Sequence, residues 1–111
     1  IFNDSDFISI HTPLSIRTKH LINQETINSM KPGVILINTA RGGILNEKDV
    51  SNSLKSGHIG GLGIDAYEFE PIVNPLFLSM DNVICTPHIG GNSKEAVYQM
   101  GVYAINALLN E

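Results

Sequence analysis

The chain has 111 residues, 42% of them hydrophobic, and its 7 Lys and Arg against 11 Asp and Glu give a formal net charge of -4. This composition is typical of one small globular domain rather than of a disordered segment. The acidic balance argues against nucleic acid or an anionic membrane surface as the main partner, because both are bound by clustered Lys and Arg.

Three further features bear on where the protein works. No apolar run approaches the roughly 20 residues that a membrane-spanning helix needs, and no secretory signal is visible. Cys85 is the single cysteine, which excludes a disulfide within the chain and is compatible with a reducing compartment. The chain begins at Ile1 rather than at an initiator methionine, so we expect a piece of a longer, cytoplasmic protein.

The first predicted elements are a strand and a short helix. The segment from Asp6 to His11 alternates loosely between apolar and polar residues, and the proline of Thr12-Pro13 ends it, as is typical of a strand. Asn23 is a good N-cap residue, and a helix is predicted from there through Met30. The sequence Lys31-Pro32-Gly33 then breaks this helix.

A second strand and a second helix follow. Val34 to Ile37 is a continuous apolar run of strand length, which predicts a strand buried on both faces, as in a parallel sheet. Asn46 is predicted to cap the next helix, whose first turn carries two acidic residues that the helix dipole favours. Gly57 is predicted to end this helix.

The second half of the chain predicts two more strands and a long helix. Gly60 to Ile64 and Asn82 to Cys85 are apolar runs of strand length. Between them, Glu70 to Met80 is predicted to be a loop that carries one helical turn. Asn92 or Ser93 is predicted to cap the last helix, whose apolar stripe has helical spacing and comprises Val97, Met100, Ala104, Ile105 and Leu108.

Strands and helices in this order predict an open α/β sheet with parallel strands. Ligands bind such sheets just beyond the carboxyl ends of the strands, and four polar residues stand there in the sequence. Arg41 follows the second predicted strand, Asp65 and Glu70 follow the third, and His88 follows the fourth. We therefore expect a cation, two acids and an imidazole to meet at one edge of the sheet.

These residue types indicate proton-transfer chemistry on a small acid. The planar guanidinium of Arg41 suits a carboxylate, and His88 can trade a proton near neutral pH. A carboxylate beside this histidine would fix its tautomer and favour its charged form. Neither a serine nor a cysteine is placed beside it as a nucleophile. Two acids and one histidine at this spacing are a poor ligand set, so no metal is predicted.

Five segments together resemble the D-isomer-specific 2-hydroxyacid dehydrogenases, most of all the branch that contains D-3-phosphoglycerate dehydrogenase. The resemblance spans almost the whole chain, and the segments occur in family order: His11-Thr12-Pro13-Leu14, Met30-Lys31-Pro32-Gly33, Ile37-Asn38-Thr39-Ala40-Arg41-Gly42-Gly43, Gly63-Ile64-Asp65-Ala66-Tyr67 with Glu70-Pro71, and Thr86-Pro87-His88-Ile89-Gly90-Gly91. The resemblance implies a Rossmann-like open parallel sheet in three αβα layers. Residues 1–111 would be the second half of an NAD-binding domain, without the Gly-rich phosphate loop and the substrate domain of the family.

The resemblance also implies an oxidoreductase that transfers a hydride between NAD(H) and C2 of a D-2-hydroxy acid or its 2-oxo acid, with D-3-phosphoglycerate as one candidate. Arg41 would hold the substrate carboxylate, His88 would be the general acid and base, and Glu70 would pair with His88. Asp65 would hydrogen-bond the nicotinamide carboxamide. The implied cofactor contacts are Thr12, Thr39, Ala40, Arg41, Asp65, His88, Ile89, Gly90 and Gly91.

The sequence leaves three interpretations of the function of the whole protein. The full-length protein is expected to be a cytoplasmic homodimer that takes a small 2-hydroxy or 2-oxo acid, and this chain alone is expected to be inactive. The alternative is a dinucleotide-binding, corepressor-like scaffold or a non-catalytic truncated fragment. Turnover with simple 2-oxo acids distinguishes an enzyme from a scaffold, because a scaffold would bind the cofactor and turn over poorly.

The roles of several individual residues also have alternative interpretations. Glu68 is the main rival of Glu70 as the partner of His88, and Asp65 could simply cap the end of its strand. His20 and His58 are interpreted as exposed loop or turn residues. The region of Met100 and Tyr103 is interpreted as core packing.

Overall fold

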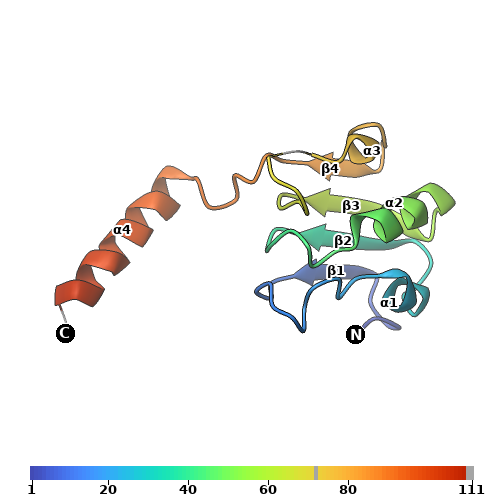
Figure 1. Cartoon of the computed structure of the whole chain (residues 1–111), viewed down its shortest axis with the longest axis horizontal. Helices are drawn as coiled ribbons and strands as arrows, with labels where there is room; N and C mark the ends of the chain where they lie inside the picture. The colour runs from blue at the N-terminus through green and yellow to red at the C-terminus, as the bar shows by residue number, and fades with distance from the viewer. Residues whose placement is uncertain (72, 110–111) are drawn as a thin grey trace.

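The structure is a computed structural model that describes residues 1–71 and 73–109. A sheet of four parallel strands forms its centre, with the strands side by side in chain order (Figure 1). These strands are β1 (Phe7–Ile10), β2 (Val34–Asn38), β3 (Ile59–Ile64) and β4 (Val83–Cys85). The predicted parallel α/β sheet is therefore confirmed, and the carboxyl ends of all four strands lie at one edge.

Helices alternate with these strands. They are α1 (Gln24–Asn28), α2 (Glu47–Ser56), α3 (Pro75–Leu78) and α4 (Lys94–Leu109). The single turn of α3 lies in the long loop between β3 and β4, as predicted. Among the described residues, no helix combines the length and apolarity that crossing a membrane requires.

Side-chain caps fix where the helices begin and end. The Asn23 side chain accepts from the Thr26 backbone N–H at 3.1 Å, and the Thr26 hydroxyl accepts from the Asn23 N–H at 3.0 Å. The Asn46 side chain caps α2 by accepting from the Asp49 N–H at 3.2 Å, and Gly57 ends this helix in the left-handed region at a φ of 78°. These caps are confirmed, whereas α1 stops at Asn28, two residues before the predicted end.

The caps also settle the start of the last helix. The hydroxyl of Ser93 accepts from the backbone N–H of Ala96 at 3.0 Å, so Ser93 is the capping residue of α4.

One face of the sheet carries the hydrophobic core. Alternate residues of the strands point to this face, where α1, α2 and α3 cover them (Figure 1). Phe77 of α3 is fully buried in the same cluster, which ties the short helix to the sheet. The strand residues of the core are Ile8, Ile10, Val34, Leu36, Ile59, Leu62 and Ile64.

The opposite face of the sheet is open, which differs from the prediction. On this face Phe7 is 66% exposed and Ile84 is 73% exposed, and alternate residues of β2 are only half-buried. The prediction of a strand buried on both faces is therefore wrong for β2 in this chain. The sequence pattern shows that both faces of the strand are apolar, but a second layer of helices is needed to cover the second face. The described residues form two layers, one of helices and one sheet, rather than the three αβα layers that the resemblance implies.

The last helix does not supply that third layer. Figure 1 shows α4 extending away from the sheet, and none of its described residues is buried. Met100 is 57% exposed and Tyr103 is 71% exposed, so the interpretation of this region as core packing is wrong. Helical spacing correctly places apolar residues on α4, but it does not say which surface they meet.

Candidate active site

The carboxyl ends of β2, β3 and β4 open into a cavity of about 640 Å³. Arg41 reaches it from the loop after β2, Asp65 and Glu70 from the loop after β3, and His88 from the loop after β4. The predicted meeting of these four residues at one edge is therefore confirmed. The other lining residues are Thr39, Gly90, Gly91, Asn92 and Met100.

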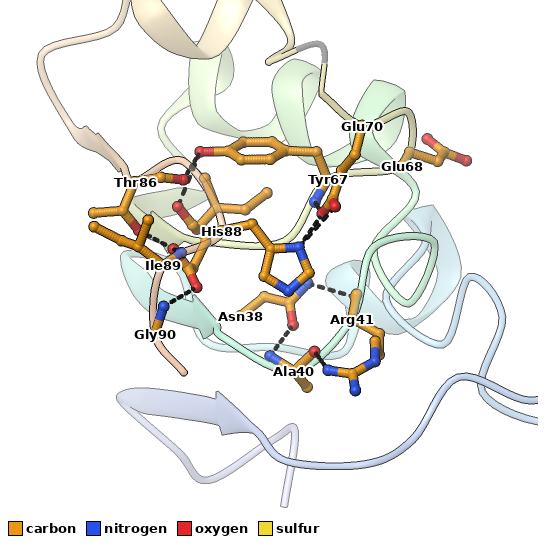
Figure 2. A network of polar contacts seen from close by, with 12 residues as sticks. Asn38, Ala40, Arg41, Tyr67, Glu68, Glu70, Thr86, His88, Ile89 and Gly90 are labelled. Carbon is orange, nitrogen blue, oxygen red and sulfur yellow. Dashed lines mark hydrogen bonds and ion pairs between the residues drawn. The ribbon is translucent and has the colours of Figure 1, made fainter. Parts of the chain in front are cut away.

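His88 and Glu70 form a close pair in this cavity (Figure 2). Nδ1 of His88 lies 2.7 Å from each carboxylate oxygen of Glu70. Because Nδ1 faces an acceptor, it carries the hydrogen, and Nε2 on the far side of the ring is left to exchange a proton. The hydrogen bond from His88, joined by one from the backbone N–H of Tyr67, lowers the pKa of Glu70 below its ordinary value.

Glu70, not Glu68, is thus the partner of His88. Glu68 instead lies 2.6 Å from Nε2 of His20, through its Oε1. His20 is half-buried, and so is His58, whose Nε2 lies 2.9 Å from the carbonyl oxygen of Ile27. The interpretation of these two histidines as exposed residues is wrong, because each meets a partner from a distant part of the chain.

The backbone at His88 is unusual. Its φ is 53°, in the left-handed region that residues other than glycine rarely adopt. The N–H of His88 donates to the carbonyl of Thr86 at 3.0 Å, which closes a tight turn around Pro87. Such a conformation persists only where the surroundings hold it, and the neighbouring contacts of Asp65 do so.

Asp65 is buried and anchors the His88 loop. Its Oδ1 accepts from the Thr86 hydroxyl at 2.5 Å and from the Ile89 N–H at 2.9 Å, and its Oδ2 accepts from the Gly90 N–H at 2.9 Å. Burial alone would raise the pKa of Asp65, but these three hydrogen bonds and the nearby His88 outweigh it and lower the pKa. Asp65 therefore does more than cap a strand end, because it fixes the loop that carries His88.

Asn38, the last residue of β2, shapes the turn that presents Arg41. Its fully buried side chain accepts from the Ala40 N–H at 3.2 Å and donates to the Arg41 carbonyl at 3.0 Å (Figure 2). Arg41 Nη1 donates to the Ala40 carbonyl at 2.7 Å, which leaves the rest of its guanidinium exposed. Sequence reasoning gave Asn38 no such role, although a buried Asn between an apolar run and a turn is a signal for it.

A second cavity, of about 340 Å³, adjoins the first. Thr39 and Arg41 line both cavities, so the two share a rim. Thr12 and Ala40 line the second one beside His11 and Pro13. Ile89 takes part differently, since its backbone N–H is bound to Asp65 while its side chain is 50% exposed. The predicted cofactor contacts thus lie around one continuous edge of the sheet.

The donors and acceptors at this edge suit the nicotinamide end of a dinucleotide. Oδ2 of Asp65 accepts one hydrogen bond in the structure, and a carboxylate oxygen has room for a second donor such as a carboxamide N–H. Nothing lies near the position that a Cβ on Gly91 would occupy, so a ligand could approach the backbone there. Within residues 1–71 and 73–109, no group of His, Cys, Asp and Glu is arranged to hold a metal ion.

Comparison with known proteins extends these observations. The sequence model described as "D-isomer specific 2-hydroxyacid dehydrogenase, NAD binding domain" matches residues 1–90, which end before α4 begins. The chain is 42% identical over 114 residues to hydroxypyruvate reductase of Thermotoga maritima, covering 100% of this chain and 37% of that protein. It is 45% identical over 96 residues to D-3-phosphoglycerate dehydrogenase of Bacillus subtilis, covering 86% of this chain and 18% of that protein.

Solved structures agree with the sequence relatives. A crystal structure of a glyoxylate reductase from Paecilomyes thermophila superposes with a TM-score of 0.89 at 36% identity, over 94% of this chain and 32% of that chain. The chain therefore spans well under half the length of each of these proteins. Relatives with different substrates in their names are similarly close, so the D-3-phosphoglycerate branch is one of several that the chain resembles. The chain belongs to the D-isomer-specific 2-hydroxyacid dehydrogenases, and its residues 1–90 match their NAD-binding domain.

Proposed function

We propose that the full-length protein containing this chain is an NAD-dependent oxidoreductase that interconverts a D-2-hydroxy acid and its 2-oxo acid. The observation that supports it most directly is the His88–Glu70 pair in a cavity that Arg41 also lines. An imidazole held by a carboxylate can move a proton at the substrate oxygen, and a guanidinium beside it can hold the substrate carboxylate.

Each of the three side chains has a distinct task in this proposal. His88 Nε2 gives a proton to the former carbonyl oxygen in reduction and takes one from the hydroxyl in oxidation. Glu70 holds the ring through Nδ1 and stabilises the imidazolium that forms. The exposed N–H groups of Arg41 orient the substrate carboxylate. NAD(H), when bound, supplies or accepts the hydride at the substrate C2.

The cofactor contacts belong to the same proposal. Asp65 both anchors the His88 loop and offers Oδ2 to the nicotinamide carboxamide. Thr39 and the glycines after His88 line the larger cavity, and Thr12 and Ala40 line the smaller one, which together would accept the nicotinamide and its ribose. The proposed set is Thr12, Thr39, Ala40, Arg41, Asp65, His88, Ile89, Gly90 and Gly91.

The decisive experiment is turnover by the full-length enzyme. Hydroxypyruvate, glyoxylate and 3-phosphohydroxypyruvate are offered with NADH and, separately, with NADPH, and the wild type is compared with His88→Asn. Asparagine tolerates the left-handed backbone at this position. We expect the variant to lose about 10²- to 10⁴-fold in kcat, the usual contribution of general acid catalysis, while its Kd for NADH is unchanged. Tight cofactor binding without turnover in the wild type would favour the scaffold reading.

The proposal also includes two expectations that rest on the family resemblance. The full-length protein is a homodimer, which size-exclusion chromatography with light scattering would measure. It works in the cytoplasm, which fractionation of the source cells would test.

A further inference from the structure

The segment from Tyr67 to Glu70 carries the carboxylate that pairs with His88, and an additional set of contacts holds this segment from its other side. These contacts come from Glu47, at the start of α2, and from His20, in the loop before α1. Neither residue lines the cavity at the carboxyl ends of the strands. Both are far from Glu70 in sequence, so they join distant parts of the chain to the loop.

The peptide unit between Tyr67 and Glu68 is fixed at both of its polar ends. Its N–H donates to Oε1 of Glu47 at 2.7 Å. Its carbonyl oxygen lies so close to Gly42 that a Cβ there would come within 1.7 Å of it. Because a peptide unit is planar, holding both ends fixes its orientation. The neighbouring N–H of Tyr67 then points at Oε1 of Glu70, which accepts it at 3.0 Å.

The side chains of this network are partly removed from solvent. Glu47 is buried, and its Oε2 also accepts from the side-chain amide of Asn74 at 3.2 Å. The Glu68 side chain is 22% exposed and its partner His20 is 33% exposed, whereas Phe69 between the two glutamates points outward and is 73% exposed. Figure 2 shows Glu68 pointing away from the Glu70–His88 pair, on the other side of the loop. Glu68 and Glu70 are thus held by contacts on opposite sides of the loop.

We propose that His20, Glu68 and Glu47 are positioning residues that hold the Tyr67–Glu70 loop so that Glu70 stays on Nδ1 of His88. This inference rests on the proposed function, because it gives these three residues a role in the same proton transfer. They do not touch the reacting atoms. They act through the Glu70 carboxylate, which only stabilises the imidazolium while the loop keeps it within hydrogen-bond distance.

A test must separate the effect of the charged groups around His88 from the effect of those around His20. Around His88 they are Glu70, Asp65 and Arg41, which share its cavity. Around His20 and Glu68 they are Glu47 and Lys48, which line a separate cavity with Glu68. A substitution in the second group could affect His88 through the loop or directly through its charge, and the two routes predict opposite signs.

The test uses His20→Asn and His20→Gln in the full-length enzyme. His20 has a φ of 51°, and asparagine tolerates that backbone but is too short to reach Glu68 as Nε2 does. Glutamine places an amide N–H near the position of Nε2 and should keep the contact. The readout is the pH at which reduction of hydroxypyruvate by NADH loses activity on the alkaline side, where His88 becomes neutral. Glu25→Gln, on the exposed surface of α1, is the matched control.

If the loop is the route, His20→Asn moves this alkaline limb to lower pH, and by less than Glu70→Gln does. His20→Gln and Glu25→Gln leave the limb in place. A direct charge effect predicts the reverse, because an unpaired Glu68 would favour the charged form of His88 and move the limb to higher pH. A merely structural defect lowers activity equally at every pH. A limb that stays in place or moves to higher pH in His20→Asn would overturn the proposal.

A double variant and a spectroscopic measurement complete the design. In a Glu70→Gln background, His20→Asn should move the limb no further, since the carboxylate through which it acts is gone. Additive shifts would contradict the inference. The titration of the His88 ring, followed by NMR in selectively labelled protein without substrate, should shift in the same pattern. That measurement tests the positioning role even if the enzyme turns over none of the substrates, an outcome that counts against the proposed function alone.

Discussion

Nδ1 of His88 lies 2.7 Å from each carboxylate oxygen of Glu70, although the two residues follow different strands of the sheet. The pair forms because β3 and β4 are neighbouring parallel strands, so the loops that follow them begin side by side. Asp65 fixes one loop through backbone N–H groups, and Glu47 fixes the other in the same way. The His88–Glu70 pair is therefore held in place by the buried carboxylates of Asp65 and Glu47, which accept from backbone N–H groups.

Replacing Glu70 by Gln removes the counter-charge of His88 but keeps the size of the side chain. The charged imidazole loses its partner, so the neutral form is reached at a lower pH. Because reduction in the proposed mechanism needs the charged form, the alkaline limb of kcat/KM should move toward acid. Steady-state kinetics between pH 5 and pH 10 would measure it, and an unmoved limb would show that the pair has no role in the proton transfer.

Replacing Arg41 by Lys keeps a positive charge but removes the planar fork. A hydrogen bond to a charged group is worth about 1.5 to 3 kcal/mol, so KM for the 2-oxo acid should rise about tenfold to a hundredfold. The Kd for NADH should change little. Initial rates over a range of substrate concentrations give KM, and fluorescence titration gives the Kd. Unchanged KM in Arg41→Lys would exclude the guanidinium as the carboxylate clamp.

The sequence predicted the positions of the functional side chains better than their contacts. The ends of the apolar runs placed Arg41, Asp65, Glu70 and His88 at the same sheet edge, because parallel strands must end together. The preference for Glu70 over Glu68 rests on the Glu70-Pro71 segment of the family resemblance, and the contacts of His88 agree with it. Glu68 contacts His20 and Glu70 contacts His88, although only Phe69 separates the two glutamates.

The errors have a common physical cause. His20 and His58 meet partners from distant segments, and local sequence gives no signal of such contacts. The region of Met100 and Tyr103 in α4 is interpreted as core packing, but both side chains are exposed. Periodicity identifies residues that share a face, but the surface that covers this face is a matter of tertiary structure. Asn38 was missed because its function is to shape a turn rather than to carry out chemistry.

The acid stability of the protein should depend on Asp65. Its pKa in the folded state lies below the ordinary value of 3.8, so the carboxylate stabilises the fold fully above that value, and this stabilisation is lost as the pH falls through the lower folded-state pKa. In Asp65→Asn one carboxylate oxygen is replaced by an amide NH₂ group, which cannot accept a hydrogen bond from the N–H group of Ile89 or Gly90. We expect a loss of about 1 to 3 kcal/mol at neutral pH and a flatter dependence of Tm on pH below 5.

Thermal unfolding at a series of pH values would measure this effect. Asp81→Asn, at an exposed position, is the control that removes the same charge without the hydrogen bonds. Equal Tm curves for the two variants would contradict the anchoring role of Asp65.

Gly42 should tolerate no side chain. A Cβ at this position would come within 1.7 Å of the Tyr67 carbonyl oxygen, which is backbone and cannot rotate away. Gly42→Ala should therefore destabilise the protein by about 1 to 3 kcal/mol or more and lower kcat by displacing the Tyr67–Glu70 loop. Gly101→Ala in α4 is the control, since nothing lies within 4 Å of its added Cβ and alanine favours a helix by about 1 kcal/mol. Denaturant unfolding and kcat together test the contact, and equal stability of the two variants would refute it.

The 111-residue chain expressed by itself should associate and show no dehydrogenase activity. Its sheet presents an open face on which Phe7 and Ile84 are mostly exposed, and α4 presents a further row of exposed apolar residues. Apolar surface of this kind drives association when nothing covers it. Phe7→Ser with Ile84→Thr should reduce association without restoring activity, because neither residue lines the cavity that holds His88. Light scattering as a function of concentration measures the first effect. A monodisperse, active chain would mean that these surfaces need no cover and that residues 1–111 complete the site.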